Sequence, residues 1–327
     1  MDFLVQQGVN WIVAIQSLGG WLEVPMKIFS FLGTQDFFFL FLPLIYWSVD
    51  AGLGLRVAMV LISSVSINYF AKLWFAGPRP YWVSGEVKAF SAESSFGIPS
   101  GHAQNSVGVW GIVASSIRKP WAWAVAFALA FFIGFSRLYL GVHFLHDVVV
   151  GWLIGCVLLW LFMKFWDSTV AWLKTKSFTS QVTLAFVVSL ILIAVGSLSV
   201  GRLDGYTFPE EWSDNALRAG ELPAPVSMED AITSAGTFFG VAFGLAWITS
   251  RSGYQATGPV EKRALRFVIG LIGVLLLWRG LAFVFPDGEN LIAYFLRYVR
   301  YTLVGFWIIG GAPWLFFRFK LAETPKM

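Results

Sequence analysis

The sequence predicts an all-α fold, a polytopic transmembrane helical bundle of about nine spans. Two observations lead to this prediction. Of the 327 residues, 57% are hydrophobic and only 13% are charged, against roughly a quarter in an average soluble domain, and the mean hydropathy is +0.70. In addition, the apolar residues fall in runs of about 20, the length that crosses a bilayer, separated by short polar turns.

The order of the elements follows from these runs. In residues 3–31 the apolar pattern is interrupted by Gln16, Glu23 and Pro25, which favours an interfacial amphipathic helix over a tenth span. The nine segments after it have the length and composition of spans: 35–50, 53–75, 102–117, 120–140, 143–166, 180–200, 231–249, 265–286 and 290–317.

Two polar segments that contain several prolines, 77–101 and 201–230, are predicted to be loops. Seven acidic residues lie in the second one, which is either a lid over a site or a solvated connection, and we favour the connection. We divide the chain into an N-terminal amphipathic segment (1–34), a membrane core (35–178) and a four-helix C-terminal transmembrane extension (179–327).

Lysines and arginines are shared unequally between the two sides of this bundle. Thirteen fall on one side, whereas the other side holds four outside the motifs described next. Because cytoplasmic loops carry the excess, the loops 77–101 and 201–230 are predicted to face outward, as in a bacterial inner membrane protein. The formal charge of +4 is scattered through short loops rather than gathered on one face, which argues against nucleic-acid binding.

All three histidines of the chain, His102, His143 and His146, lie at the ends of predicted spans on the outward side. His102 opens a helix directly after Ser100 and Gly101. Ser100 is a candidate N-cap, and Gly101 lets the backbone come close to a ligand. Free N–H groups at a helix N-terminus attract anions, so this position is suited to a phosphate group.

Cations and a carboxylate accompany these histidines. Lys72 ends one predicted span and Arg79 follows seven residues later, which supplies a point charge and a planar fork for an oxyanion. Arg137 ends another span. His143 and Asp147 are four residues apart and share a helix face, so the carboxylate is expected to orient the imidazole.

These groups are the parts that phosphoryl transfer needs: a histidine nucleophile oriented by a carboxylate, a second histidine that protonates the leaving oxygen, and cations for the equatorial oxygens. The cations would do the work that Mg²⁺ does elsewhere, and the sequence offers no obvious carboxylate cluster for a metal. We therefore expect a metal-independent enzyme without a cofactor.

Three segments together resemble the signature of the type-2 phosphatidic acid phosphatase and vanadium haloperoxidase superfamily. They are Lys72, six residues and Arg79-Pro80; then Pro99-Ser100-Gly101-His102; then Ser136-Arg137, five residues, His143, three residues and Asp147. The resemblance covers about residues 35 to 166, and flanking residues such as Tyr81-Trp82 are similar to those of the bacterial membrane-bound lipid phosphatase branch. One such motif alone would be weak evidence, whereas three in order are strong evidence.

The resemblance implies a role for each matched residue. His143 would form a phosphohistidine, Asp147 would polarise it, and His102 would be the general acid. The phosphate would be held by Lys72, Arg79, Ser100, Gly101 and Arg137. His146 lies outside the matched positions and about 100° around the helix from His143, so we leave it out of the site.

The expected function is hydrolysis of a lipid phosphate or diphosphate, for which the resemblance allows undecaprenyl diphosphate, phosphatidylglycerol phosphate or phosphatidate. The main alternative is a lipid phosphotransferase, in which a lipid alcohol attacks the same intermediate. A lipid transporter or binding protein is a third alternative, because the four C-terminal helices have no counterpart in the motifs. The sequence leaves the lipid and the oligomeric state open.

Three further arginines, Arg279, Arg297 and Arg300, fall in the outward half of the last two predicted spans. An unpaired charge there costs at least a few kcal/mol, so each needs a partner. They either pair with Asp287, Glu289 or carbonyl groups at the helix ends, or they form a cationic annex that binds a lipid headgroup or a second phosphate.

Overall fold

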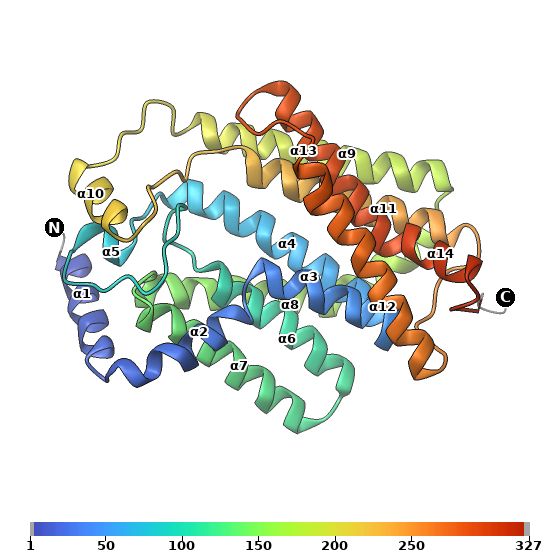
Figure 1. Ribbon diagram of the computed structural model, residues 1–327, viewed down its shortest axis with the longest axis horizontal. Helices are drawn as coiled ribbons and strands as arrows, with labels where there is room; N and C mark the ends of the chain where they lie inside the picture. The colour runs from blue at the N-terminus through green and yellow to red at the C-terminus, as the bar shows by residue number, and fades with distance from the viewer. Residues whose placement is uncertain (1–2, 324–327) are drawn as a thin grey trace. The chain divides into compact units, whose positions relative to one another are not determined.

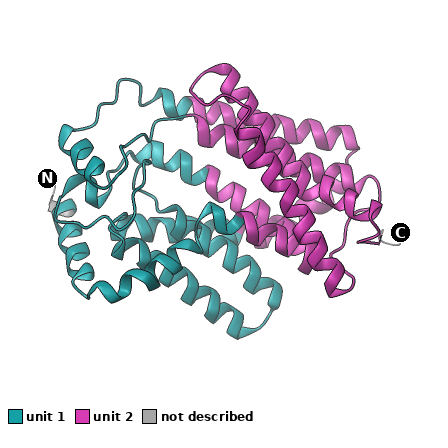
Figure 2. Cartoon of the chain, viewed as in Figure 1, with its two compact units in different colours: residues 1–38, 67–160, 198–227 teal, residues 39–66, 161–197, 228–327 magenta. Residues whose placement is uncertain are grey.

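The computed structural model describes residues 3–323, which fold into helices and connecting loops without a β-strand (Figure 1). The all-α prediction is confirmed. The chain forms two compact units that are interleaved along the sequence (Figure 2). Unit 1 comprises residues 1–38, 67–160 and 198–227, and unit 2 comprises residues 39–66, 161–197 and 228–327. The predicted division at residues 34 and 178 stays a prediction.

Unit 1 contains the segments that carry the three motifs. Its elements are α1 (Phe3–Gln16), η1 (Gly20–Leu22), α2 (Glu23–Phe31), the start of α3 (Gln35–Leu44), the end of α4 (Ala51–Phe75), α5 (Pro80–Val83), α6 (Gly101–Ile117), α7 (Pro120–Tyr139), the first part of α8 (Leu145–Lys174), the last turn of α9 (Phe178–Gly201) and α10 (Glu210–Arg218). The segment 3–31 therefore consists of two short helices and a 3-10 turn.

Close contact between α6 and α8 depends on two glycines of α8. A Cβ atom at Gly151 would lie 2.5 Å from the carbonyl oxygen of Ser100, and one at Gly155 would lie 2.7 Å from that of Gln104. Because backbone atoms cannot give way as a flexible side chain can, only glycine fits at these positions. This contact brings the start of α6, where His102 lies, against the start of α8.

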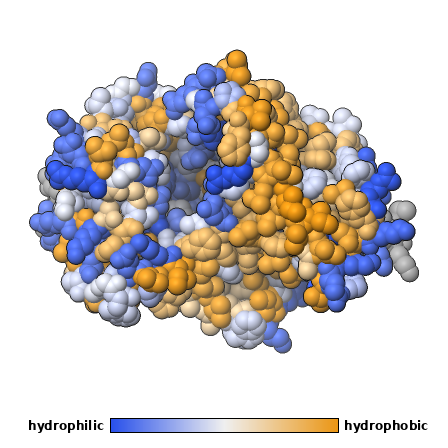
Figure 3. All heavy atoms as spheres, viewed as in Figure 1, coloured by the Kyte–Doolittle hydropathy of each residue, from blue (hydrophilic) through white to orange (hydrophobic). Residues whose placement is uncertain are grey.

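Unit 2 consists of the remaining helical parts and most of the C-terminal extension. It holds the end of α3, η2 (Ile45–Val49), the first part of α4, the last part of α8, most of α9, α11 (Glu229–Thr249), α12 (Val260–Leu275), η3 (Leu276–Gly280), α13 (Leu291–Phe306), η4 (Trp307–Gly311) and α14 (Ala312–Arg318). Gly236 and Gly240 of α11 let its backbone touch that of α13. On the face shown in Figure 3, hydrophobic residues cover much of this unit.

Six helical segments of the described residues are long and apolar enough to cross a membrane, or seven if the bent pair Gly20–Phe31 and Gln35–Val49 is one span. The predicted count of nine is not confirmed. The segment 102–117 falls short because α6 has 17 residues, which extend over about 26 Å, less than the hydrocarbon core of about 30 Å. The segment 265–286 is not among the six; its helical part, α12 and η3, ends at Gly280, and a loop follows. The protein is nevertheless an integral membrane protein with a bundle of apolar helices.

Candidate active site

The three motif segments interlock in unit 1. The amide of Ser100 donates to the carbonyl oxygen of Asp147 at 2.9 Å, which joins the second motif to the third. A Cβ atom at Gly97 would lie 2.5 Å from the carbonyl oxygen of Pro78 and 3.1 Å from Oδ2 of Asp147. The loop between the first two motifs therefore packs closely against the first motif and the third. These contacts bring the three motif segments together.

His143 is buried, and each of its ring nitrogens faces a different partner. Nδ1 lies 3.3 Å from Oδ2 of Asp147, and this oxygen also accepts a hydrogen bond from the amide of Phe144 at 2.9 Å. Nε2 lies 3.4 Å from Nη1 of Arg79. A carboxylate beside Nδ1 favours the tautomer with the proton on Nδ1, which leaves the lone pair of Nε2 directed toward the cations.

The turn before His143 is set by the end of α7. The amides of Val142 and His143 both donate to the carbonyl oxygen of Arg137, at 3.2 and 3.3 Å. Gly141 has a φ of +77°, a conformation that glycine adopts without the cost a side chain would add. This turn holds the imidazole and Arg137 on one short piece of chain.

The surroundings of His143 favour its neutral form. Burial lowers the pKa of the His143 imidazole well below its ordinary value, and the positive charges of Arg79, Lys72 and Arg137 lower it further. A neutral imidazole has a free lone pair, whereas a protonated one cannot attack phosphorus. The charge of the site thus keeps its candidate nucleophile ready for attack.

Arg79 is fully buried and is held by backbone carbonyl groups. Its Nε donates to the carbonyl oxygen of Ser95 at 2.6 Å, its Nη1 to that of Val142 at 2.9 Å and its Nη2 to that of Phe96 at 3.2 Å. Lys72 donates from Nζ to Oγ of Ser95 at 2.8 Å, and Arg79 reaches the same hydroxyl at 3.0 Å. The two cations of the first motif therefore meet at one serine.

Glu93, which lies outside the three motifs, brings a carboxylate among the cations of the site. Its carboxylate pairs with Arg137 and lies 3.7 Å from Arg79. Burial alone would raise the pKa of Glu93, but the charges of Arg137, Arg79, His102 and Lys72 outweigh it and hold the pKa well below the usual range. An ionised carboxylate between these cations occupies the kind of position that a phosphate oxygen would take.

Two groups of the second motif have no partner within residues 3–323. They are Oγ of Ser100 and Nε2 of His102, both buried. Ser100 occupies the N-cap position of α6, but its side chain makes no capping hydrogen bond. Since buried polar groups are rarely left without a partner, these two are candidates to bind a ligand. Gly101 instead packs closely on the side chain of Asn68.

Two family models match this chain. The model of the PAP2 superfamily, the type-2 phosphatidic acid phosphatases, matches residues 53–171, and the model described as PAP2 superfamily phosphatase, transmembrane extension, matches residues 232–324. Phosphatidylglycerophosphatase B of Bacillus subtilis (strain 168) is 31% identical over 173 residues, which are 48% of this chain and 80% of that protein. The chain belongs to the PAP2 superfamily.

Other relatives differ in how much of the chain they match. Glucose-6-phosphatase 3 of Bos taurus is 26% identical over an alignment of 364 positions, which covers 100% of this chain and 99% of that protein. The crystal structure of the first transmembrane PAP2 type phosphatidylglycerolphosphate phosphatase from Bacillus subtilis matches 51% of this chain and 88% of that chain, with 27% identity and a TM-score of 0.44. Membership of the superfamily is thus confirmed, whereas the bacterial lipid phosphatase branch is not.

The chain is therefore a membrane phosphatase of the PAP2 superfamily, and all three of the superfamily's signature segments lie in its unit 1. Among the described residues there is no group of three or more histidine, cysteine, aspartate or glutamate side chains that could hold a metal ion. The cations around His143 are the groups available to neutralise a phosphate.

Residues outside the signature also contribute to the PAP2 site. Besides Glu93, they are Ser95, which receives both Lys72 and Arg79, and Ser30 of α2, whose hydroxyl accepts from Arg137. A serine in the last turn of a helix carries no visible signal, so Ser30 could not have been found from the sequence. Glu93 did carry a signal in the sequence, because it is an acidic residue in the loop between the first motif, which is basic, and the second motif, which contains His102.

Residues 201–230 pack against the loops of the PAP2 site, so the simple solvated connection that we favoured is wrong. The amide of Ala224 donates to the carbonyl oxygen of Ser94 at 3.0 Å, and Nδ2 of Asn215 donates to that of Trp82 at 3.0 Å. The ring of Phe96 lies 5.8 Å from that of Tyr206 and 6.1 Å from that of Phe208. The segment therefore packs on Phe96, and the carbonyl group of Phe96 accepts a hydrogen bond from Arg79.

The other residues considered in the sequence are His146, which we left out of the site, and the three annex arginines. His146 is half exposed, and its Nε2 is 3.2 Å from Oδ1 of Asp147. Arg297 and Arg300 line one small pocket of unit 2, whereas Arg279 is exposed and lies over the ring of Trp278 instead. The structure thus joins two of the three annex arginines.

Proposed function

We propose that this PAP2 phosphatase hydrolyses the phosphate ester or diphosphate of a membrane lipid through a phosphohistidine on Nε2 of His143. The observation that carries this proposal is the position of the site at the ends of three apolar helices. Lys72 lies in the last turn of α4, Arg137 in the last turn of α7 and Asp147 in the first turn of α8. A phosphate at this level is at the membrane surface, where lipid headgroups lie.

The first half-reaction transfers the phosphoryl group to the protein. Nε2 of His143 attacks the phosphorus, the bond to the ester oxygen breaks, and His102 donates a proton to that oxygen. Asp147 stabilises the positive charge that the His143 ring gains, through Nδ1 at 3.3 Å. Burial lowers the pKa of the His102 imidazole to about 3, and the charge of Arg137 adds to this effect. The protonated form that this step requires therefore depends on the negative charge of the bound phosphate, which favours it.

The second half-reaction releases phosphate. A water molecule loses a proton to His102 and attacks the phosphorus, the P–N bond breaks, and inorganic phosphate leaves with His143 neutral again. Lys72, Arg79 and Arg137 would stabilise the equatorial oxygens in both steps. Since the three cations supply this charge, the proposed reaction is independent of metal ions.

A hollow of about 420 Å³ in unit 1 supports a lipid substrate. Residues 200–208 and 224–226 line it, and its mostly apolar wall includes Leu203, Tyr206, Phe208 and Val226. Tyr206 and Phe208 pack on Phe96 next to Arg79. An apolar hollow beside a phosphate site suits the hydrophobic part of a lipid phosphate.

Orientation and compartment belong to this proposal as well. The unequal distribution of lysine and arginine supports an orientation in which the motif loops lie outside the cytoplasm. In a bacterial inner membrane the site would face the periplasm, and its substrate would be a lipid phosphate of the outer leaflet. Hydrolysis is proposed over transfer to a second lipid alcohol, and identifying the products separates these two reactions.

A second candidate substrate is a sugar phosphate. It is favoured by the similarity to glucose-6-phosphatase 3, which extends over the whole chain and includes the C-terminal extension, whereas the similarity to phosphatidylglycerophosphatase B covers half of it. A soluble phosphate ester would use the same cations and the same nucleophile. It would not depend on the apolar hollow.

Phosphate release by the purified full-length protein, in excess EDTA, tests the proposal. The substrates are phosphatidate, phosphatidylglycerol phosphate, undecaprenyl diphosphate and glucose 6-phosphate, with wild type and His143→Ala compared. We expect release from a lipid phosphate that survives EDTA and is lost in the variant. Preference for glucose 6-phosphate would establish the second candidate, and a phosphorylated acceptor lipid without free phosphate would establish the transferase.

A further inference from the structure

Arg300 of α13 is a buried cation for which the described residues supply little compensation. It is 7% exposed, and its Nε has no hydrogen-bond partner within residues 3–323. Its guanidinium group lies over the ring of Tyr301, 5.2 Å from the centroid. A cation–π contact stabilises a charge by only about 0.5 to 2 kcal/mol, far less than an unpaired buried charge loses on leaving water.

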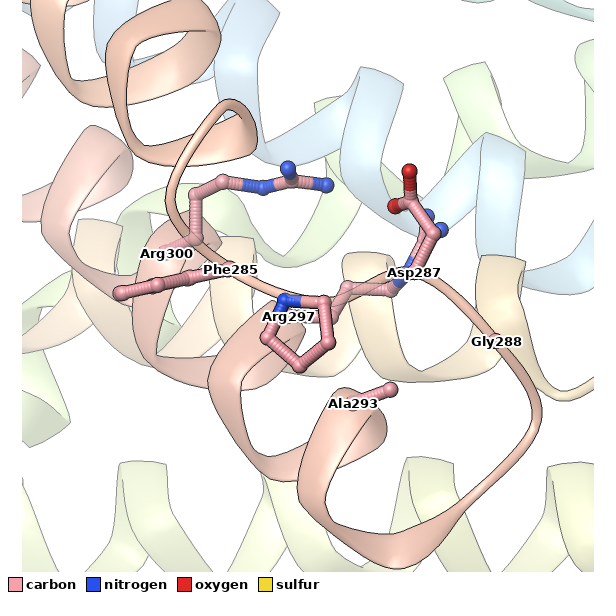
Figure 4. A pocket seen from close by; sticks show the side chains of 7 residues that line it. Phe285, Asp287, Gly288, Ala293, Arg297 and Arg300 are labelled. Carbon is pink, nitrogen blue, oxygen red and sulfur yellow. The ribbon is translucent and has the colours of Figure 1, made fainter.

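A small pocket of unit 2 gives access to this arginine. It is lined on the α13 side by Ala293, Arg297 and Arg300 and on the loop side by residues 285–288 (Figure 4). Its volume is about 10 Å³, enough for one water-sized group. One oxygen atom of an anion fits this space, while the rest of the anion stays at the surface.

Arg297 adds a second positive charge at the same pocket. Its Nη2 forms an ion pair of 2.7 Å with Oε2 of Glu229, and both side chains keep contact with solvent. One of its guanidinium nitrogens is thus taken by a carboxylate, and the planar fork has other N–H groups. Two guanidinium groups three residues apart on one helix match the several oxygens of a phosphate.

The surface around the pocket is apolar. Phe283 is 91% exposed and Leu291 is 84% exposed, and Val284, Ile292 and Phe295 are also exposed. Leu291 begins the apolar segment Leu291–Arg318, which is long enough to cross a membrane. Exposed apolar side chains at the start of a membrane helix lie among lipids. Arg297 and Arg300 follow Leu291 by six and nine residues, about 9 and 14 Å along the helix. Their side chains reach back to the loop 285–288 that precedes the helix, and so toward the headgroups.

We propose that Arg300 and Arg297 form a binding site for the phosphate group of an anionic lipid, distinct from the catalytic residues and located in the C-terminal extension. Asp287 also lines the pocket. Its carboxylate would compete with the lipid phosphate, because both groups bind guanidinium groups. Free phosphate has the same chemistry, and the apolar surroundings favour the lipid source.

Lipid binding by Arg300→Met tests the site. The probe is a short-chain phosphatidylglycerol, a phosphodiester, added to the full-length protein in phosphatidylcholine nanodiscs and measured by native mass spectrometry. A hydrogen-bonded charge contributes about 1.5 to 3 kcal/mol, so we expect binding to weaken about tenfold or more. Arg279→Met is the matched control, an exposed arginine that also lies over an aromatic ring, that of Trp278. Unchanged binding in Arg300→Met, or an equal loss in the control, overturns the proposal.

Inorganic phosphate separates the two sources of the anion. We expect it to displace phosphatidylglycerol from the wild type only at concentrations well above that of the lipid. If inorganic phosphate displaces phosphatidylglycerol from the wild type at equal concentration, and Arg300→Met loses phosphate binding as it loses lipid binding, the assignment to a lipid is overturned. We expect the catalytic site to bind phosphate equally in both proteins, because Arg300 is not one of its residues, so the difference between them reports on Arg300.

Thermal unfolding in lipid-free detergent distinguishes a ligand site from an internal ion pair. If Arg300 is kept for a ligand, Arg300→Met unfolds at the wild-type temperature or above it, and Asp287→Asn binds phosphatidylglycerol more tightly than the wild type. If Arg300→Met unfolds at a lower temperature and Asp287→Asn weakens lipid binding, Asp287 is the structural partner of Arg300 and the proposal fails.

Discussion

At the scale of single residues, the charge around His143 decides when the proposed nucleophile can act. Protonation of the imidazole abolishes nucleophilic attack, and the lowered pKa moves this loss of activity to a pH below the ordinary histidine pKa of about 6.5. Activity should therefore persist as the pH falls through 6.5. Because Lys72 opposes the protonated form of His143, Lys72→Met should raise the pKa and shift the acid limb to higher pH.

Profiles of kcat/KM against pH for the wild type and Lys72→Met, with one substrate, check this prediction. The substrate's own titration is common to both profiles, so the shift between them isolates the enzyme. An acid limb at the same pH in both proteins, or one that moves to lower pH in the variant, would contradict the proposed electrostatics.

Glu93 gives a second prediction at this scale. Its carboxylate lies among the cations that are expected to hold phosphate, so it competes with the ligand. Glu93→Gln removes the negative charge and keeps the shape, and inhibition by inorganic phosphate should then become several-fold tighter. Weaker inhibition by phosphate in this variant would show that Glu93 positions Arg137 rather than competing for it.

The candidate catalytic residues were predictable because each is a charged or histidine side chain at the end of an apolar run. His143, Asp147, Lys72 and Arg79 lie in one hydrogen-bonded group, as expected. Ser30 and Ser95 were not predictable, since a serine beside a helix has many uses that its sequence context does not distinguish.

At the scale of elements, the close contact of α6 and α8 determines whether the second and third motifs meet. Gly151→Ala places a methyl group 2.5 Å from the carbonyl oxygen of Ser100. We expect the free energy of unfolding to fall by about 1 to 3 kcal/mol and phosphate release to fall at least tenfold, as the bond from Ser100 to Asp147 is stretched. Gly280→Ala is the control, because nothing lies within 4 Å of its Cβ position. Equal effects in thermal unfolding and phosphate release for both variants would refute this role.

The segment 201–230 provides a prediction that separates the two substrate classes. Phe208 lines the apolar hollow and packs on Phe96. Phe208→Ala should raise KM for a long-chain lipid phosphate about tenfold, from the loss of roughly 1 to 3 kcal/mol of apolar contact, and should change KM for a water-soluble phosphate ester little. Equal effects on both substrates would show that the hollow is structural.

The limits of the helix predictions have physical causes. Apolar length alone identified the candidate spans, but α6 is too short to meet the span criterion and α12 carries Arg266, which is buried and donates to backbone carbonyl groups. Composition does not show whether a helix is covered by protein or by lipid. The packing of 201–230 depends on aromatic contacts over more than a hundred residues of sequence, which no local pattern encodes.

At the scale of the whole molecule, the structure joins a PAP2 core to an extension that belongs to the same superfamily. The two compact units are interleaved along the chain, so the extension is not an independent appendage in sequence. The proposed catalytic mechanism and the proposed lipid phosphate site would together account for buried charges in each unit, such as Arg79 and Arg300.

The covalent intermediate is the central claim, and trapping it is the most direct test. Phosphate-labelled lipid substrate is mixed with the full-length protein, turnover is stopped with alkali, in which phosphohistidine is stable, and the label is located by mass spectrometry of peptides. We expect the label on the peptide that contains His143, in excess EDTA, and none on His143→Ala. Turnover without a labelled protein, or a label on another residue, would contradict the mechanism.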